Sequence, residues 1–180
     1  MEVLTDYVCW FFIKNMRQPD YQMVKETAQK VLNDNYVISP PIDIFDIANS
    51  YGFQINELDF GEEYNKVAGF ITPKKRVIYI NKNDSENRKK FSIAHELGHW
   101  LLHKKELETM PEKYAILLRI PLGQTENDPI EKEANCFAAN LLVPKDMLDK
   151  HKGKDINEIA EIFAVSKDVI GFRMKFEYGN

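Results

Sequence analysis

Apolar and polar positions along this chain repeat with two different periods. Residues 21–32 (YQMVKETAQKVL) and 42–51 carry apolar side chains three to four positions apart, which predicts two helices. Asp20 is placed to cap the first helix, and Gly52 follows the second where a C-terminal glycine belongs. Between them, Ser39-Pro40-Pro41 breaks the pattern. The chain therefore opens with a pair of separated helices.

The middle of the chain changes to a period of two. Residues 53–58 alternate in this way, and residues 67–72 and 77–81 flank a turn at Pro73-Lys74-Lys75. This predicts three strands, of which the last two form a hairpin. The helical period returns over residues 85–103. We therefore expect a small sheet followed directly by a long helix.

The second half of the chain is predominantly helical. Residues 129–142 predict a helix that begins on a proline, and residues 155–178 predict two further helices joined near Ala164-Val165-Ser166. Residues 104–127 form a long connection in which only residues 114–118 look regular. With the small sheet, these helices predict an α+β fold.

Composition is consistent with one domain covering residues 1–180, because 44% of the residues are hydrophobic and can form one core. We divide it into N-terminal helices (1–35), a core (36–150) and a C-terminal helical pair (151–180). With 24 basic and 28 acidic residues, the net charge is -4. This balance argues against broad electrostatic binding to nucleic acid or to an anionic membrane.

The cysteine count and the N-terminus favour a cytoplasmic protein. Cys9 and Cys136 are the only cysteines, too few for the disulfide framework of a small secreted domain. The apolar run at residues 7–13 follows acidic residues and is far shorter than the roughly 20 residues that span a bilayer. We interpret it as a packing helix.

The clearest chemical signal lies on the helix at residues 85–103, where the sequence reads His95-Glu96-Leu97-Gly98-His99. Residues four apart share a helix face, so His95 and His99 can bind one ion at roughly 2.0 to 2.1 Å. Glu96 projects about 100° around the helix from His95 and can reach a water on the metal without ligating it. Zinc acidifies that water, and Glu96 can act as the general base and then protonate the departing amine. The pattern predicts amide hydrolysis, although chance can also place these three residues at this spacing.

A catalytic zinc ion usually takes three protein ligands. His103 is excluded as the third, because eight residues separate it from His95, or about 12 Å of helix rise. It is better interpreted as a residue at the helix end or behind the ligands.

The helix at residues 129–142 offers a better third ligand. At about 100° per residue, Glu131 falls near the edge of the buried stripe, whereas Glu133 points well away from it. Glu131 is therefore the predicted ligand, and Asn135, one turn later, can hydrogen-bond a ligand histidine and orient it. Alternatively, the negative charge of Glu131 only stabilises the N-terminus of the helix through the helix dipole. Glu133 would have the same effect.

Two segments, FSIAHELGH at residues 91–99 and EKEANCFAANLLVP at residues 131–144, resemble the ImmA/IrrE family of zinc metallopeptidases, which are gluzincin-like. A weaker resemblance runs from Pro40-Pro41 to residues 163–166. Family members often have methionine where this chain has Val143, a change that affects nothing catalytic. The resemblance implies a zincin-like, thermolysin-like α+β core with a three-stranded sheet packed on helices, followed by a helical tail.

The resemblance also implies a function. Family members of understood role are cytoplasmic and cut a helix-turn-helix repressor, which releases genes of mobile elements or stress responses. For this chain the resemblance implies a zinc-dependent endopeptidase with one zinc ion, in which Glu131 is the third protein ligand. It also implies that the protein substrate is a repressor of the XRE type.

Two rival hypotheses use the same scaffold without catalysis. The tail resembles half of a helix-turn-helix, with Lys167, Arg173 and Lys175 as phosphate contacts, which favours a DNA-binding regulator with an inactive site. Two packing helices explain that pattern equally well, and the net charge adds no support, so we expect no direct nucleic-acid binding. A protein-binding module that does not cut is disfavoured by Glu96, which a structural zinc site does not need.

Substrate contacts are less defined by the sequence. An extended peptide can add a strand to the predicted hairpin and so present its carbonyl to the metal. Residues 104–127 either form the other wall or belong to the core, which is the better interpretation of their apolar side chains. Tyr79, Tyr114 and His103 all stay open as the group that stabilises the oxyanion.

Overall fold

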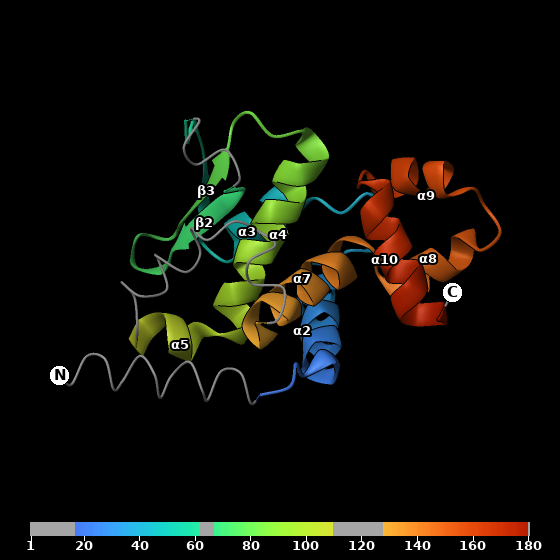
Figure 1. The fold of residues 1–180 in the computed structure, drawn as a ribbon, viewed down its shortest axis with the longest axis horizontal. Coiled ribbons are helices and arrows are strands. Elements are labelled where there is room, and N and C mark those ends of the chain that lie inside the picture. The colour runs from blue at the N-terminus through green and yellow to red at the C-terminus, as the bar shows by residue number, and fades with distance from the viewer. Residues whose placement is uncertain (1–16, 62–66, 110–127, 180) are drawn as a thin grey trace.

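The computed structural model describes residues 17–61, 67–109 and 128–179 and shows an α+β fold, as predicted (Figure 1). A sheet and the helix α4 lie on one side of helix α7, and the C-terminal helices lie on the other. In chain order the elements are α2 (Tyr21–Asp34), α3 (Ile44–Ser50), β1 (Gln54–Leu58), β2 (Gly69–Thr72), η2 (Pro73–Lys75), β3 (Val77–Asn81), α4 (Glu86–Leu102), α5 (Lys104–Thr109), α7 (Pro129–Leu142), α8 (Lys145–Leu148), η3 (Asp149–His151), α9 (Ile156–Phe163) and α10 (Lys167–Tyr178).

The two predicted N-terminal helices are confirmed. The side chain of Asp20 caps α2 by accepting a hydrogen bond from the backbone N–H of Met23, at 2.9 Å. Gly52 follows α3 with φ +80°, the left-handed conformation that a helix-ending glycine adopts at little cost. Both helices bury an apolar side, through Val24 and Ile47 among others.

The predicted hairpin and the three strands are also confirmed. The strand order is β1-β3-β2, with β3 central, parallel to β1 and antiparallel to β2. Phe70 lies opposite Tyr79 in the hairpin register. The turn between the hairpin strands is the short 3-10 helix η2, which ends at Arg76 with φ +54°. Two of the buried residues of β3, Ile78 and Ile80, belong to the main core.

Two long helices form the centre of the molecule. α4 packs against the sheet and against α7, and α2 packs against α7 as well. The helices α4 and α7 approach closely at Gly98, where an added Cβ would lie 2.8 Å from Cδ1 of the buried Phe137. Only a residue without a side chain allows this contact, so Gly98 sets the distance between the two helices.

The end of α4 differs from the prediction. Residues 104–109 form the helix α5, which begins directly after His103, whereas the sequence indicated an irregular connection there. The interpretations of residues 7–13 and 114–118 lie outside the described residues. Within the described ranges, no helix combines the length and the apolar character needed to cross a membrane.

The C-terminal helices α9 and α10 are joined over residues 164–166, as predicted. Ser166 caps α10, and its hydroxyl accepts a hydrogen bond from the backbone N–H of Val169. Ile170 is fully buried, so α10 presents one apolar side to the rest of the fold.

Candidate metal centre

The helix α4 buries the whole of the predicted motif. Ser85 caps its N-terminus by accepting a hydrogen bond from the backbone N–H of Arg88. The next turns pass between the sheet and α7, so His95, Glu96 and His99 are 8%, 4% and 0% exposed. Polar side chains this deeply buried need partners.

Polar groups of three residues, His95 and His99 on α4 and Glu131 on α7, converge at one point. The Nε2 atoms of His95 and His99 lie 2.9 Å apart. Glu131 reaches both rings from α7. Its Oε2 atom lies 3.4 Å from Nε2 of His95, and its Oε1 atom lies 3.3 Å from Nε2 of His99. One atom from each of the three residues lies within 4.8 Å of the others, which is close enough for them to hold one metal ion together. The structure thus brings together the three residues that the sequence predicted as ligands.

Asn135 lies behind this group, as expected from its place one turn after Glu131. Its Oδ1 atom is 3.0 Å from Nδ1 of His95. Because an amide oxygen only accepts, Nδ1 carries the proton of a neutral His95, and Nε2 directs its lone pair at the cluster. This is the tautomer that a metal ligand requires.

Charge also favours a cation at this position. Burial would raise the pKa of Glu131, but His99 and His95 beside it hold that pKa well below its usual value. Burial would lower the pKa of His95, but Glu131, together with Glu96 and Asn135, outweighs this effect and raises the pKa. The cluster therefore holds an ionised carboxylate directed at two imidazole nitrogens. Two nitrogens and one carboxylate oxygen are a donor set that zinc commonly takes in hydrolytic sites.

Glu96 lies next to the cluster without belonging to it. Its carboxylate accepts a hydrogen bond from the backbone N–H of Ile71, in β2. Its Oε2 atom is buried and has no hydrogen-bond partner among the described residues. Burial raises the pKa of Glu96, although His95 and His99 act in the opposite direction. Such a carboxylate is ready to accept a proton.

Glu133 corrects one prediction. The sequence placed this side chain away from the buried side of its helix, but it is 0% exposed. The reason is that α7 is covered by α2 as well as by α4. Both carboxylate oxygens of Glu133 accept from Nη2 of Arg17, at 2.9 Å, and Oε1 also accepts from the backbone N–H of Asp20, at 2.7 Å. Nothing in the sequence around Arg17 predicted this pair.

His103 lies outside the ligand group, as predicted. It ends α4, is 0% exposed, and its Nε2 atom is 3.5 Å from Oε2 of Glu133. Burial lowers its pKa to about 3, and His99 acts in the same direction. Tyr79 stacks on Phe70 in the sheet at a centroid distance of 4.8 Å, and Tyr114 lies outside the described residues.

One of the three proposed phosphate contacts is unavailable for that role. Arg173 is 0% exposed, and its Nε atom donates to the backbone oxygen of Val143 at 2.9 Å. Its Nη1 atom donates to Glu177 at 2.8 Å. Only Lys167 and Lys175 of that group are exposed, so α10 acts as a packing helix at Arg173.

Comparisons with known proteins show which family the chain is similar to. Residues 48–175 match the model of the Peptidase M78 family, described as the IrrE N-terminal-like domain. Over 161 residues the chain is 29% identical to the uncharacterized immunity region protein 2 of Bacillus phage phi105, covering 87% of this chain and 91% of that protein. Over 135 residues it is 26% identical to metallopeptidase ImmA of Bacillus subtilis (strain 168), covering 73% and 74% of the two.

A solved structure shares the fold. A transcriptional regulator of Mycobacterium tuberculosis superposes with a TM-score of 0.62 at 14% identity, over 84% of this chain. The chain spans 46% of that regulator's length, about half. At this identity the likeness concerns the fold alone.

Proposed function

Since the chain belongs to the IrrE N-terminal-like (Peptidase M78) family, we propose that it is a zinc-dependent endopeptidase. In this proposal, His95, His99 and Glu131 hold a single zinc ion, and Glu96 is the catalytic base. The sheet, α4 and α7 then correspond to a zincin-like core.

The observation that carries the proposal is the convergence of three ligand atoms within 4.8 Å beside a buried carboxylate that does not take part in the cluster. A structural site has no use for such a carboxylate. In a hydrolase, Glu96 supplies the base, because one of its oxygens is held by Ile71 and the other has no partner among the described residues.

The chemistry divides between the metal and the protein. A zinc ion held by His95, His99 and Glu131 would polarise a peptide carbonyl and acidify water. Glu96 accepts the proton of the attacking water and delivers it to the departing amine. Asn135 keeps the ring of His95 in the tautomer and orientation that ligation requires.

The substrate is proposed to bind as an added strand along β2, which ends the described sheet. The backbone N–H of Asn81 donates to the backbone oxygen of Ala68. Because hydrogen-bonded and non-hydrogen-bonded pairs alternate in an antiparallel ladder, the N–H and C=O groups of Gly69 and Ile71 point away from β3. The N–H of Ile71 already reaches Glu96. A peptide bound along this edge therefore passes beside the base.

For the substrate itself we propose a helix-turn-helix repressor in the cytoplasm, as in family members of understood role. The relative from Bacillus phage phi105 supports this choice, because it is named as a protein of the immunity region of that phage.

The test compares the wild type with Glu96→Gln, each loaded with zinc and mixed with helix-turn-helix repressors from the same genome. We expect one cut by the wild type, no cut by Glu96→Gln, and the same zinc content in both proteins. Cleavage by both proteins, or by neither, would contradict the proposal.

A further inference from the structure

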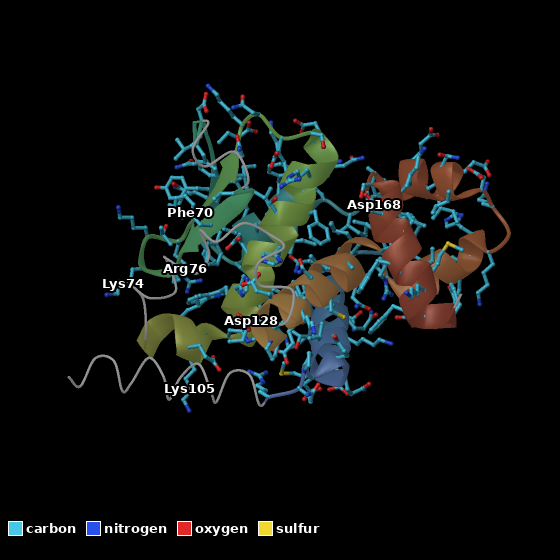
Figure 2. All side chains as sticks on the ribbon, viewed as in Figure 1. Phe70, Lys74, Arg76, Lys105, Asp128 and Asp168 are labelled. Carbon is cyan, nitrogen blue, oxygen red and sulfur yellow. The ribbon has the colours of Figure 1, made fainter. Side chains whose placement is uncertain are left out.

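A group of cations lies where the hairpin turns, at one end of β2. It consists of Lys74, Lys75 and Arg76 on the turn and Lys104 at the start of α5, and we call it the basic surface. All four residues are exposed. Figure 2 shows Lys74 and Arg76 at the end of the sheet where β2 passes into β3. The group is notable in a chain whose net charge is -4.

The turn cations are not neutralised by the part of the protein that the structure describes. Lys74, Lys75 and Arg76 make no ion pair with a carboxylate in residues 17–61, 67–109 and 128–179. Most other exposed cations do make such pairs, among them Lys30, Lys82, Arg88, Lys145 and Lys154. The turn therefore presents positive charge outward.

Trp100 fixes the geometry of this surface. The guanidinium of Arg76 lies 4.3 Å from the centroid of its ring, and Nζ of Lys104 lies 4.9 Å from the same centroid. The Nη1 atom of Arg76 also donates to the backbone oxygen of Tyr51, at 3.2 Å. These contacts hold Arg76 at φ +54°, a conformation that favours glycine. Arg76 thus anchors the turn to α4, and Lys74 and Lys75 extend from it.

The position of the surface relates it to the proposed peptidase site. The turn η2 continues directly from Thr72, the last residue of β2, and the same strand contacts Glu96 through Ile71. A peptide lying along β2 past Glu96 reaches Lys74 and Lys75 a few residues from the bond that is cut.

We propose that the basic surface binds acidic side chains of the peptide substrate, on the side of the scissile bond that lies over the turn. This inference rests on the proposed function and adds a substrate class to it, namely an extended segment with clustered Asp or Glu residues. Charge of this kind sets partner choice and association rate more than total affinity.

An acidic peptide fits the surface better than nucleic acid does. The turn cations continue directly from one edge strand, β2. DNA binding instead uses a row of cations across several phosphates together with an element that enters a groove. The net negative charge of the chain also repels a polyanion as long and dense as DNA.

The experiment measures binding, so it does not depend on cleavage. The probe is a fluorescent peptide of about a dozen residues with an Asp-Glu block, compared with a twin carrying Asn and Gln and with a short DNA duplex. Each probe is titrated against the full chain with zinc bound. The parent protein carries the single substitution Glu96→Gln, so that it binds the peptide without cutting it. The test variant adds Lys74→Gln and Lys75→Gln, and the matched control instead adds Lys167→Gln and Lys175→Gln, two exposed lysines on α10.

We expect the acidic peptide to bind roughly fivefold more weakly to the turn variant than to its parent, with no change in the control variant. The neutral twin should bind weakly and equally to all three proteins. Equal binding of the acidic peptide by the turn variant and its parent, or no binding by any protein, would overturn the inference. Tighter binding of the duplex than of the acidic peptide, lost in the turn variant, would overturn it in favour of nucleic acid. A lack of repressor cleavage by the wild type would count against the peptidase proposal alone.

Discussion

The Nδ1 atom of His95 lies 3.0 Å from the Oδ1 atom of Asn135, so the helix that carries two candidate ligands is joined to the helix that carries the third. The contact assigns the protonated nitrogen of His95 and leaves the other nitrogen facing His99 and Glu131. Metal affinity should therefore depend on a residue that does not touch the metal.

Replacing Asn135 should weaken zinc binding. In Asn135→Ala, the ring of His95 loses its fixed tautomer, and we expect zinc affinity to fall by about 10-fold to 100-fold in competition with a chromophoric chelator. Asn140→Ala is the control, because Asn140 lies on the same helix and donates to the backbone oxygen and Sγ of Cys136. An affinity equal to that of the wild type in Asn135→Ala would show that the contact has no orienting role.

Gly98 should not tolerate even a methyl group. In Gly98→Ala, the added Cβ would lie 2.8 Å from Cδ1 of Phe137, so α4 and α7 must separate. We expect a loss of about 1 to 3 kcal/mol in the free energy of unfolding, measured by urea denaturation. Adding Phe137→Leu should recover part of that loss. If the double variant is less stable than the sum of the two single effects predicts, this contact does not limit the helix spacing.

Arg17 and Glu133 should contribute unequally to stability. Arg17→Met leaves a carboxylate that is 0% exposed without its charged partner, which should cost about 3 kcal/mol. Glu133→Gln keeps an acceptor for the backbone N–H of Asp20 and lets the half-exposed Arg17 turn to water, which should cost about 1 kcal/mol. Urea denaturation of the two single variants and the double variant measures this. Combining the substitutions should restore stability relative to Arg17→Met, and a further loss in the double variant would refute the ion pair.

Cys136 should be inert in the folded protein. Burial raises the pKa of its thiol to about 11, so almost none is thiolate near pH 8. In a Cys9→Ser background, alkylation by iodoacetamide should be at least roughly a hundredfold slower in native protein than in concentrated urea.

The same pKa shift has a consequence for stability. The folded state binds this proton more tightly than the unfolded state, whose thiol has an ordinary pKa of 9.0. The contribution of Cys136 is therefore complete below about pH 9 and is lost as the pH rises toward 11. Equal alkylation rates in native and unfolded protein would contradict both expectations.

Local sequence rules predicted the elements near the site. Alternation over β1 and the helical period over α4 depend on neighbours within a few residues, and so do the caps at Asp20 and Gly52. The positions of Glu131 and Asn135 also followed from the geometry of one helix, since both needed only to face α4.

Long-range packing could not be predicted in this way. Glu133 was placed by considering one buried side of α7, but α2 covers a second side and brings Arg17 with it from 116 positions away. The DNA-binding hypothesis treated Arg173 as a phosphate contact, yet its side chain reaches the backbone oxygen of Val143, at the end of α7. Both cases depend on which helix covers which, and no local pattern encodes that.

Zinc content in two glutamate variants tests the central claim, a three-ligand site that spans α4 and α7. Glu131→Gln and Glu133→Gln change neighbouring carboxylates of the same helix, but only Glu131 lies within reach of both histidine nitrogens. After dialysis against a weak chelator, Glu133→Gln should retain about one zinc ion per folded chain, and Glu131→Gln should retain almost none. Full zinc retention by Glu131→Gln, with loss from Glu133→Gln, would contradict the site described for this protein.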